Sequence, residues 1–342
     1  MSLYESEELP FDKRFARYNE PGGPGLAVMA IQDDATRFKK GYGLSNLVTK
    51  EPVDCDTNFR MASVSKQFTA MAVAILEEQG LLARDDYIGV YLDDLPEYMQ
   101  PIRVRHLVHH LSGLPDYADA LWSTDKSKPL ITHHDVYKYY QQQNQLDFAV
   151  GQQHEYSNGG YSLLALVVER AAGKSLRDFS QEQIFRPAGM NTTDIIQYPT
   201  QIHKQAISYG DWPFYEDIDF NTGNALHGED GVYTSINDME KWIRALDNHL
   251  LVDAATTEKI FAKVETNTGK PVDYGYGWQW EKYKGDIDLV GHAGSWVGFH
   301  TFIVKAPERK TWFVAFSNST AIDAEDAVFH MADYYFNVDS SV

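Results

Sequence analysis

Cysteine occurs only once in this chain of 342 residues, as Cys55. A single cysteine cannot form an intrachain disulfide, and the absence of a CxxC pair excludes cysteine zinc sites and dithiol redox centres. Long apolar stretches are also missing. The longest runs, at 25–31 and 163–168, fall far short of the ~20 residues that cross a bilayer. We therefore expect no transmembrane segment.

Positive charge is scarce as well. Lysine and arginine number 30 against 49 aspartates and glutamates, which gives a net charge of -19 and a pI of about 4.9. Nucleic acid and anionic membranes repel such a chain at long range, so we expect no nucleic-acid partner. Residues 1–8, MSLYESEE, lack the basic start and apolar stretch of a secretory signal. As it stands the sequence predicts a cytoplasmic protein, or a periplasmic or secreted one if a signal has been removed.

What is present is the composition of a folded globular protein, with 43% hydrophobic, 13% aromatic and 23% charged residues. The length corresponds to about two domains, or to one domain with a large insertion. Alternating and continuous apolar patterns predict strands at 25–31, 36–42, 287–291, 299–305 and 311–316. Helical spacing predicts helices at 64–79, 102–111, 134–142, 161–172, 175–184, 236–246 and 321–336.

Strands near both chain ends, with helices between them, predict an α+β fold. One antiparallel sheet is built from both ends and flanked by helices, and a mostly helical region is inserted. We expect a discontinuous sheet domain over 1–59 and 230–342, and a helical domain over 60–229. The active site is expected in the cleft between them.

The most informative segment is Arg60-Met61-Ala62-Ser63-Val64-Ser65-Lys66. Ser63 and Lys66 stand at i and i+3 where a helix begins, so one turn brings both side chains to the same face. A serine hydroxyl needs a base within hydrogen-bond reach, and a helix N-terminus disfavours an ammonium and offers amides to an oxyanion. An SxxK tetrad alone is expected about once by chance in a chain of this length.

Two further segments raise the specificity of this pattern. In the first, Tyr156 can relay a proton and Asn158 can bind a substrate amide or carbonyl, immediately before an apolar helix. The second, Val290–Phe299, lies on a predicted strand whose glycines permit a ligand to approach the backbone closely. There an edge amide can complete an oxyanion hole.

These motifs, in this order, resemble the serine β-lactamase and penicillin-binding protein superfamily. The similarity is greatest to its branch of class C β-lactamases, D-Ala-D-Ala carboxypeptidases and esterases, and it covers about residues 20 to 335. Further matching segments are 102–108, 112–117, 185–190 and 231–235.

The resemblance implies a β-lactamase/transpeptidase-like fold and assigns the site residues. It implies that Ser63 is the acylated nucleophile, that Lys66 and Tyr156 share the proton transfers, and that Asn158 positions the substrate. The backbone amides of Ser63 and Ser295 would bind the oxyanion.

One departure from the family pattern bears on the substrate. His292-Ala293-Gly294 replaces the Lys-Thr-Gly of many β-lactamases, so the lysine charge and threonine hydroxyl that help to hold a substrate carboxylate are absent. We expect His292 and Ser295 to bind substrate, and Trp296, which follows the oxyanion residue, to line the cleft.

The sequence therefore predicts a serine hydrolase that works through a covalent acyl-enzyme, without cofactor or metal. Its expected substrates are small esters, amides, β-lactams or D-amino-acid peptides. An esterase or D-amino-acid peptidase, with at most weak β-lactamase activity, is favoured over an efficient class C-like β-lactamase. The oligomeric state is not predicted.

Two alternatives from other classes stay open. A binding or regulatory protein that keeps the scaffold without turnover predicts that Ser63→Ala leaves its biological activity intact. The second alternative is a metal hydrolase, which predicts loss of activity with a chelator. Its candidate ligands are the pairs His109-His110 and His133-His134, with His106 nearby. No HExxH motif or carboxylate at ligand spacing accompanies these histidines, so structural roles are favoured for them.

Overall fold

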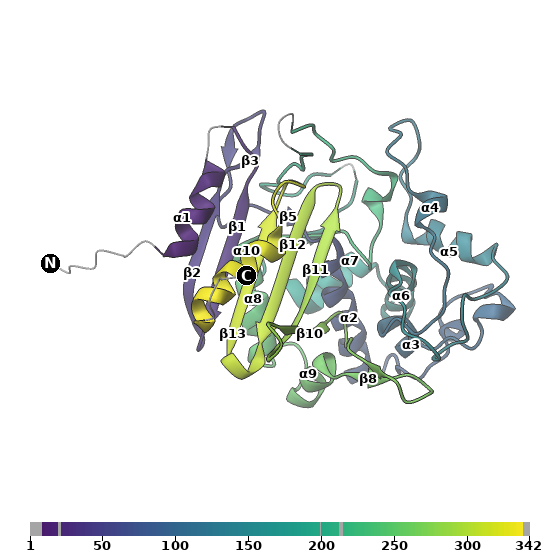
Figure 1. The fold of residues 1–342 in the computed structure, drawn as a ribbon. Coiled ribbons are helices and arrows are strands. Elements are labelled where there is room, and N and C mark those ends of the chain that lie inside the picture. Colours follow the sequence, from purple (N-terminus) through teal and green to yellow (C-terminus); the bar gives the residue numbers. More distant parts are fainter. Residues whose placement is uncertain (1–8, 20–21, 199, 212–214, 338–342) are drawn as a thin grey trace.

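The computed structural model describes residues 9–19, 22–198, 200–211 and 215–337. At its centre lies a six-stranded antiparallel sheet with the strand order β10-β11-β12-β13-β1-β2 (Figure 1). Its strands are β1 (Leu26–Gln32), β2 (Ala35–Tyr42), β10 (Gln279–Tyr283), β11 (Ile287–Trp296), β12 (Phe299–Ala306) and β13 (Thr311–Ser317). Because β1 pairs with β13, the sheet joins both ends of the chain, which confirms the predicted fold class. The first eight residues lie outside the described part.

Side chains of the sheet alternate between two buried layers. Along β1, Ala27, Met29 and Ile31 belong to one hydrophobic core, and Leu26, Val28 and Ala30 belong to the other. A strand that is covered on both faces reads as a continuous apolar run, because successive side chains point to opposite faces. This explains why the first strand was predictable from its composition.

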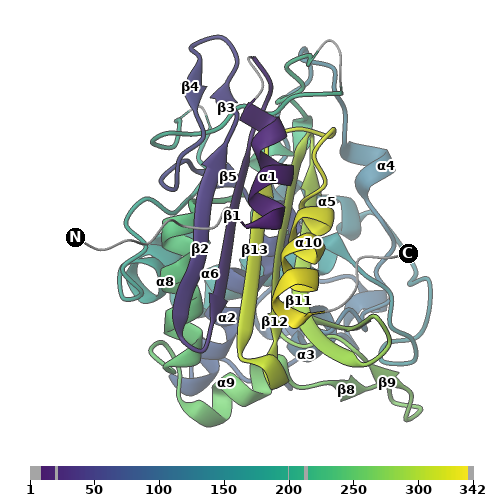
Figure 2. The ribbon, with the colours of Figure 1, turned by 60° about the vertical axis from the view of Figure 1, so that its left-hand side comes forward.

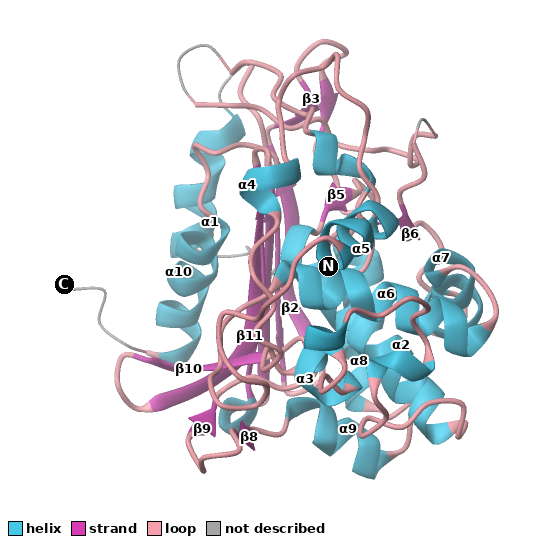
Figure 3. Ribbon diagram, turned by 90° about the vertical axis from the view of Figure 1, so that its right-hand side faces the viewer, coloured by secondary structure: helices cyan, strands magenta, loops and turns pink. Residues whose placement is uncertain are grey.

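Helices form the outer layers of the molecule. They are α1 (Pro10–Ala16), α2 (Lys66–Glu78), α3 (Val104–Val108), α4 (Ala118–Leu121), α5 (His133–Gln141), α6 (Asn158–Ala172), α7 (Leu176–Ser180), α8 (Ile236–Asp247), α9 (Ala254–Phe261) and α10 (Ala324–Phe336). The two terminal helices, α1 and α10, lie together over one face of the sheet (Figure 2). The remaining helices lie beyond the opposite face (Figure 3).

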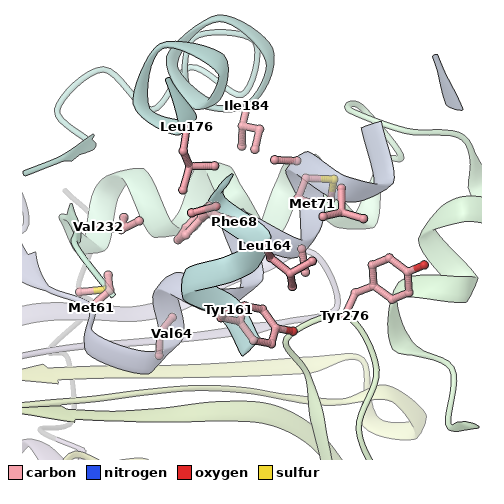
Figure 4. Close-up of a cluster of buried hydrophobic side chains, with 14 of the residues drawn as sticks. Met61, Val64, Phe68, Met71, Tyr161, Leu164, Leu176, Ile184, Val232 and Tyr276 are labelled. Carbon is pink, nitrogen blue, oxygen red and sulfur yellow. The ribbon is translucent and has the colours of Figure 1, made fainter. Parts of the chain in front are cut away.

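The larger hydrophobic core joins the helical region to the sheet. Phe68 of α2 contacts the rings of Phe185 and Trp242 at centroid distances of 5.5 and 4.6 Å. Figure 4 shows Leu164 of α6 and Leu176 of α7 in the same cluster, around α2. The amphipathic spacing that predicts these helices therefore produces a buried α2, surrounded by its neighbours.

Several helix ends differ from their predictions. The helix expected at 64–79 begins as a 3₁₀ turn, Ala62–Ser65, before α2. The helix expected at 102–111 is only five residues long, and His110, two residues after its end, has a left-handed φ of 57°. The helix expected at 175–184 is α7 followed by a π turn at Gln181–Phe185. Local periodicity does not register such changes of hydrogen-bonding pattern.

Short strands escape the sequence patterns altogether. They are β3 (Leu44–Asn46), β4 (Glu51–Pro52), β5 (Phe59–Arg60), β6 (Asp194–Ile195), β7 (Val232–Thr234), β8 (Val264–Glu265) and β9 (Pro271–Val272). Strands β5, β7 and β6 form a small sheet, so the chain segments that enter and leave the helical region are paired directly.

A buried ion pair accompanies this small sheet. The Arg60 guanidinium donates from Nε and Nη2 to Asp230, with an Nη2–Oδ2 distance of 2.8 Å, and it also donates to the Asn224 carbonyl. Burial of both partners makes this pair costly to break, because either charge alone would be left desolvated. The division into a sheet domain and an inserted helical domain stays a prediction.

None of the helices in the described ranges combines the length and the apolar character that crossing a membrane requires.

The start of α3 yields a prediction about acid stability. His106 is buried, and its Nδ1 accepts a hydrogen bond of 3.0 Å from the backbone N–H of Arg103. Burial, together with the neighbouring Arg105 and Arg103, lowers the pKa of His106 to about 4. Because the unfolded chain binds this proton near pH 6.5, the stabilisation is present above that pH and is lost as the pH falls toward 4.

We expect His106→Asn, which keeps an acceptor at this position, to flatten the pH dependence of the free energy of unfolding. The difference in slope should be on the order of 1 kcal/mol per pH unit between pH 6 and pH 4.5. Urea unfolding at several pH values measures it. The exposed His249 provides the control, because His249→Asn should retain the slope of the parent chain. Equal slopes for His106→Asn and the parent chain would contradict the assignment.

Candidate active site

Ser63 and Lys66 meet as the SxxK spacing predicts. Ser63 lies in the 3₁₀ turn and is half-buried, whereas Lys66 opens α2 and is fully buried. The Lys66 Nζ donates hydrogen bonds to Ser63 Oγ at 3.0 Å, to Asn158 Oδ1 at 2.8 Å and to the Glu229 carbonyl at 3.0 Å. All three protons of the buried ammonium therefore have an acceptor.

This arrangement also suits the neutral amine. If Lys66 gives up one proton, its two remaining N–H groups can stay on Asn158 and on the Glu229 carbonyl. The lone pair then points toward Ser63 Oγ, which can donate its own proton in turn. The geometry around Nζ is thus compatible with a lysine that takes a proton from the serine.

The backbone before Ser63 is strained and closely packed. Ala62 has a left-handed φ of 47°, which is unfavourable for a residue with a Cβ. The Met61 carbonyl accepts a 2.9 Å hydrogen bond from Thr301 Oγ1 on β12, and the Met61 N–H donates to the Val232 carbonyl. These hydrogen bonds to Thr301 and Val232 fix the turn that carries Ser63.

Strand β11 runs alongside this turn with an open edge. Strand β10 pairs with it only from Ile287 to Gly291, so within the described residues no strand borders the segment from His292 to Trp296 on that side. A Cβ added to Gly294 would lie 2.4 Å from the Met61 carbonyl oxygen and 3.1 Å from the Ser63 nitrogen. Ser295 is exposed directly beside this contact. The role of the Ser295 backbone amide in binding the oxyanion stays a prediction.

Tyr156 and Asn158 enter the site from the start of α6. Ser157 caps this helix by accepting from the Gly160 N–H, and its own N–H donates to His110 Nδ1 at 3.0 Å. The ring of Tyr156 lies 4.4 Å from that of His110, and its centroid is 4.9 Å from Lys66 Nζ. Tyr156 therefore contacts Lys66 through its ring face rather than through a hydrogen bond. Tyr156 is 42% exposed, unlike the buried Lys66 beside it.

His292 lies behind Tyr156 in a buried aromatic group. Tyr274 Oη lies 2.9 Å from His292 Nε2, and Nδ1 lies 2.6 Å from the Ala293 carbonyl. Burial, with a contribution from Lys66, lowers the pKa of His292 to about 3, so the ring is neutral at pH 7. A carbonyl can only accept, so Nδ1 carries the proton and Nε2 accepts from Tyr274. Direct contact of His292 with substrate stays a prediction, and it requires Tyr274 to give up this hydrogen bond.

Trp296 lies at the end of β11 and forms an aromatic wall with Trp122. The two rings meet edge to face at a centroid distance of 4.7 Å, and Trp296 Nε1 donates to Asn224 Oδ1 at 2.8 Å. Tyr117 continues the wall through a perpendicular contact with Trp122. Such rigid rings suit an apolar part of a substrate. Trp212, another tryptophan of the sequence, lies outside the described residues.

Sequence reasoning missed two residues that hold the site together. The Glu229 carboxylate is buried and accepts hydrogen bonds from Tyr117 Oη at 2.6 Å and from Ser162 Oγ at 2.7 Å. Burial raises the pKa of Glu229, and the nearby Lys66 opposes this increase. His110 is fully buried, and burial holds its pKa well below 6.5.

Neither residue belongs to a recognisable motif. The available signals are weak: Glu229 stands in an acidic pair flanked by glycines just before a short strand, and His110 is one of a histidine pair. The structural roles expected for the group His106, His109 and His110 agree with their burial. His109 Nδ1, for example, lies 3.1 Å from the Tyr274 carbonyl.

The close approach at Gly294 yields a prediction. Gly294→Ala should lower the free energy of unfolding by about 1–3 kcal/mol, because the new methyl group overlaps the backbone of Met61. Gly210→Ala is the matched control, since the nearest atoms to its Cβ lie 3.8 Å away. Denaturant titration of both variants measures the difference. An unchanged stability of Gly294→Ala would show that the β11 edge is farther from the 3₁₀ turn than described.

The chain is similar to several known proteins over most of its length. A family model described as Beta-lactamase matches residues 11–334. Penicillin-binding protein 4* of Bacillus subtilis (strain 168) is 27% identical over 324 residues, which are 90% of this chain and 71% of that protein. A D-aminopeptidase of Brucella anthropi is 27% identical over 327 residues, 93% of this chain. The chain spans only 60% of the length of that relative.

A solved structure supports the same comparison at the level of the fold. The octameric penicillin-binding protein homologue from Pyrococcus abyssi superposes with a TM-score of 0.79 at 24% sequence identity. The match covers 92% of this chain and 74% of that one.

Proposed function

Because this chain belongs to the Beta-lactamase family and is a serine hydrolase, we propose that it forms an acyl-enzyme on Ser63 with a D-amino-acid amide, ester or short peptide. The observation that carries the proposal is the 3.0 Å hydrogen bond between Lys66 Nζ and Ser63 Oγ, with the other two Nζ protons held elsewhere. No other hydroxyl in the described residues forms a hydrogen bond with the Lys66 ammonium.

The reaction begins with Lys66 as the neutral amine. Lys66 accepts the proton of Ser63 as Oγ attacks the substrate carbonyl, and the amides of Ser63 and Ser295 stabilise the oxyanion. The leaving amine or alcohol takes a proton from Lys66 or Tyr156, and the acyl group remains on Oγ. Water then attacks the acyl-enzyme ester and gives a proton to the same groups, which return a proton to Ser63 Oγ as the acid is released.

Several features support a D-amino-acid substrate over a β-lactam. Ala293 offers no hydroxyl to a substrate carboxylate, and both ring nitrogens of His292 already have partners. The net charge of -19 attracts a substrate with a free ammonium group. A related chain of Brucella anthropi carries the name D-aminopeptidase. Trp122 and Trp296 can contact the apolar side chain of such a substrate.

Intact mass spectrometry tests the proposal. We expect an activated aryl ester of a D-amino acid to add its acyl mass within seconds, at Ser63 by peptide mapping, and Ser63→Ala to abolish the adduct. Ser65→Ala is the matched control: this serine lies two residues away, its Oγ accepts from the Val232 N–H, and the adduct should persist.

The same experiment with a penicillin ranks the activities. A penicillin adduct that decays more slowly than the D-aminoacyl adduct supports the amidase or esterase. Faster decay of the penicillin adduct would instead identify an efficient β-lactamase. If no reagent adds mass at Ser63, the proposal is wrong, and a non-catalytic binding protein becomes the better hypothesis.

The buried Glu229 yields a prediction about stability. Its carboxyl group accepts hydrogen bonds from Tyr117 and Ser162, whereas a glutamine has only one oxygen and would direct its NH2 group at one of these donors. Glu229→Gln should therefore lower the free energy of unfolding by about 1–3 kcal/mol, as measured by denaturant titration. The control is Glu155→Gln, which changes an exposed carboxylate and should leave the stability unchanged. An unchanged stability of Glu229→Gln would contradict the role given to the carboxyl group.

A further inference from the structure

Three potential metal ligands converge between helices α5 and α6, away from the Ser63 site. His133 and His134 are the first two residues of α5, and Glu169 projects from α6. His133 Nε2 lies 3.4 Å from Glu169 Oε1, and His134 Nε2 lies 3.8 Å from Oε2. One ligand atom from each residue lies within 4.8 Å of the other two. The carboxylate thus faces both histidines, one oxygen to each.

The buried histidine of this group lacks the partners that its polar atoms require. Only 7% of the His133 side chain is exposed, yet neither its Nδ1 nor its Nε2 has a hydrogen-bond partner among the described residues. Buried polar atoms in folded proteins are almost always paired, and an unpaired one is costly. His133 Nε2 lies 3.4 Å from Glu169 Oε1, close enough for electrostatic attraction, but the angle is not that of a hydrogen bond.

The spacing of the three groups suits ligands of a shared ion. Zinc binds histidine nitrogen and carboxylate oxygen at about 2.0–2.2 Å, so two ligands of a tetrahedral site lie roughly 3.3–3.5 Å apart. The His133–Glu169 distance is within this range, and the His134–Glu169 distance needs only a small side-chain rotation. Imidazole and carboxylate together select Zn²⁺ and similar divalent ions over Mg²⁺ or Ca²⁺.

The surroundings hold two of the ligands in place. Glu169 Oε1 accepts a 3.2 Å hydrogen bond from the Leu176 N–H, which orients the carboxylate. His227 stacks on the ring of His133 at a centroid distance of 5.3 Å, and its own Nε2 lies 2.8 Å from the Ile196 carbonyl. Such outer contacts are a regular part of metal sites, because they fix the direction of the ligand lone pairs.

We propose that His133, His134 and Glu169 form a binding site for a divalent ion of the zinc class, with water as the fourth ligand. The exposed side of the site is formed by His134, through which the ion and its water can enter. Two neutral imidazoles and one carboxylate leave a net charge of +1 on the complex, which the surplus of negative charge on this chain favours.

The site ties α5 to α6 and is separate from the proposed chemistry. Glu169 follows Asn158 by eleven residues in α6, a distance of about 16 Å along the helix axis. The ion is therefore expected to stabilise the fold rather than to take part in acyl transfer. If no ion binds at this site, the proposed acyl transfer at Ser63 is unaffected. The proposal does not imply a metal hydrolase centred on these histidines.

The test uses the full chain without an affinity tag, stripped of metal by a chelator. Competition with a chromophoric zinc indicator should report one Zn²⁺ per chain, and Co²⁺ should produce visible d–d absorption. Zn²⁺ should also raise the thermal unfolding midpoint. Glu169→Gln keeps the shape of the side chain, and His134→Ala removes an exposed ligand, so both variants should fold.

We expect either variant to weaken Zn²⁺ binding at least tenfold and to abolish the thermal shift. The matched control is His330→Ala on α10, which removes another histidine–carboxylate pair, His330 with Asp326 at 3.2 Å, and should leave binding unchanged. Equal Zn²⁺ affinity in His134→Ala, Glu169→Gln and the parent chain would overturn the proposal. Absence of stoichiometric binding to the parent chain would do the same.

Discussion

The candidate site depends on satisfying one buried cation. A lysine ammonium is expensive to remove from water unless each of its protons finds an acceptor. In this protein the three acceptors of Lys66 come from three separate places: the 3₁₀ turn that carries Ser63, the start of α6, and the backbone at Glu229. The buried charge can exist only where these segments meet, so the same requirement that makes Lys66 costly also positions the serine and the asparagine.

Other buried polar groups keep those three segments in register. Arg60 and Asp230 anchor the residues next to the turn and next to Glu229, and His110 holds the backbone of the loop before α6. Tyr117 and Ser162 satisfy the Glu229 carboxylate. Each of these contacts joins a different pair of elements, and together they form a buried polar network around Lys66.

The sequence predicted the features that have a local signal. Five strands of the central sheet, the helix after Ser63 and the SxxK, Tyr156 and Asn158 motifs all depend on residues close together in the chain. The sixth strand, β10, was not predicted, and it lies at the edge of the sheet. Glu229, His110 and Glu169 could not be predicted, because their partners lie far away: Tyr117 and Glu229 are 112 residues apart. The two-residue strands of the small sheet are too short to show a period, and the end of α3 depends on the left-handed backbone of His110.

The pairing of β5 with β7 has a consequence for motion. These strands carry the chain into the helical region and out of it again, and the buried Arg60–Asp230 pair lies beside them. Rotation about this point would have to break backbone hydrogen bonds and separate two desolvated charges. The 3₁₀ turn that carries Ser63 begins two residues after β5, and the Met61 carbonyl is hydrogen-bonded to Thr301 on the central sheet. The nucleophile is therefore held at a fixed distance from the sheet, and thermal motion of the helices is transmitted to it only weakly.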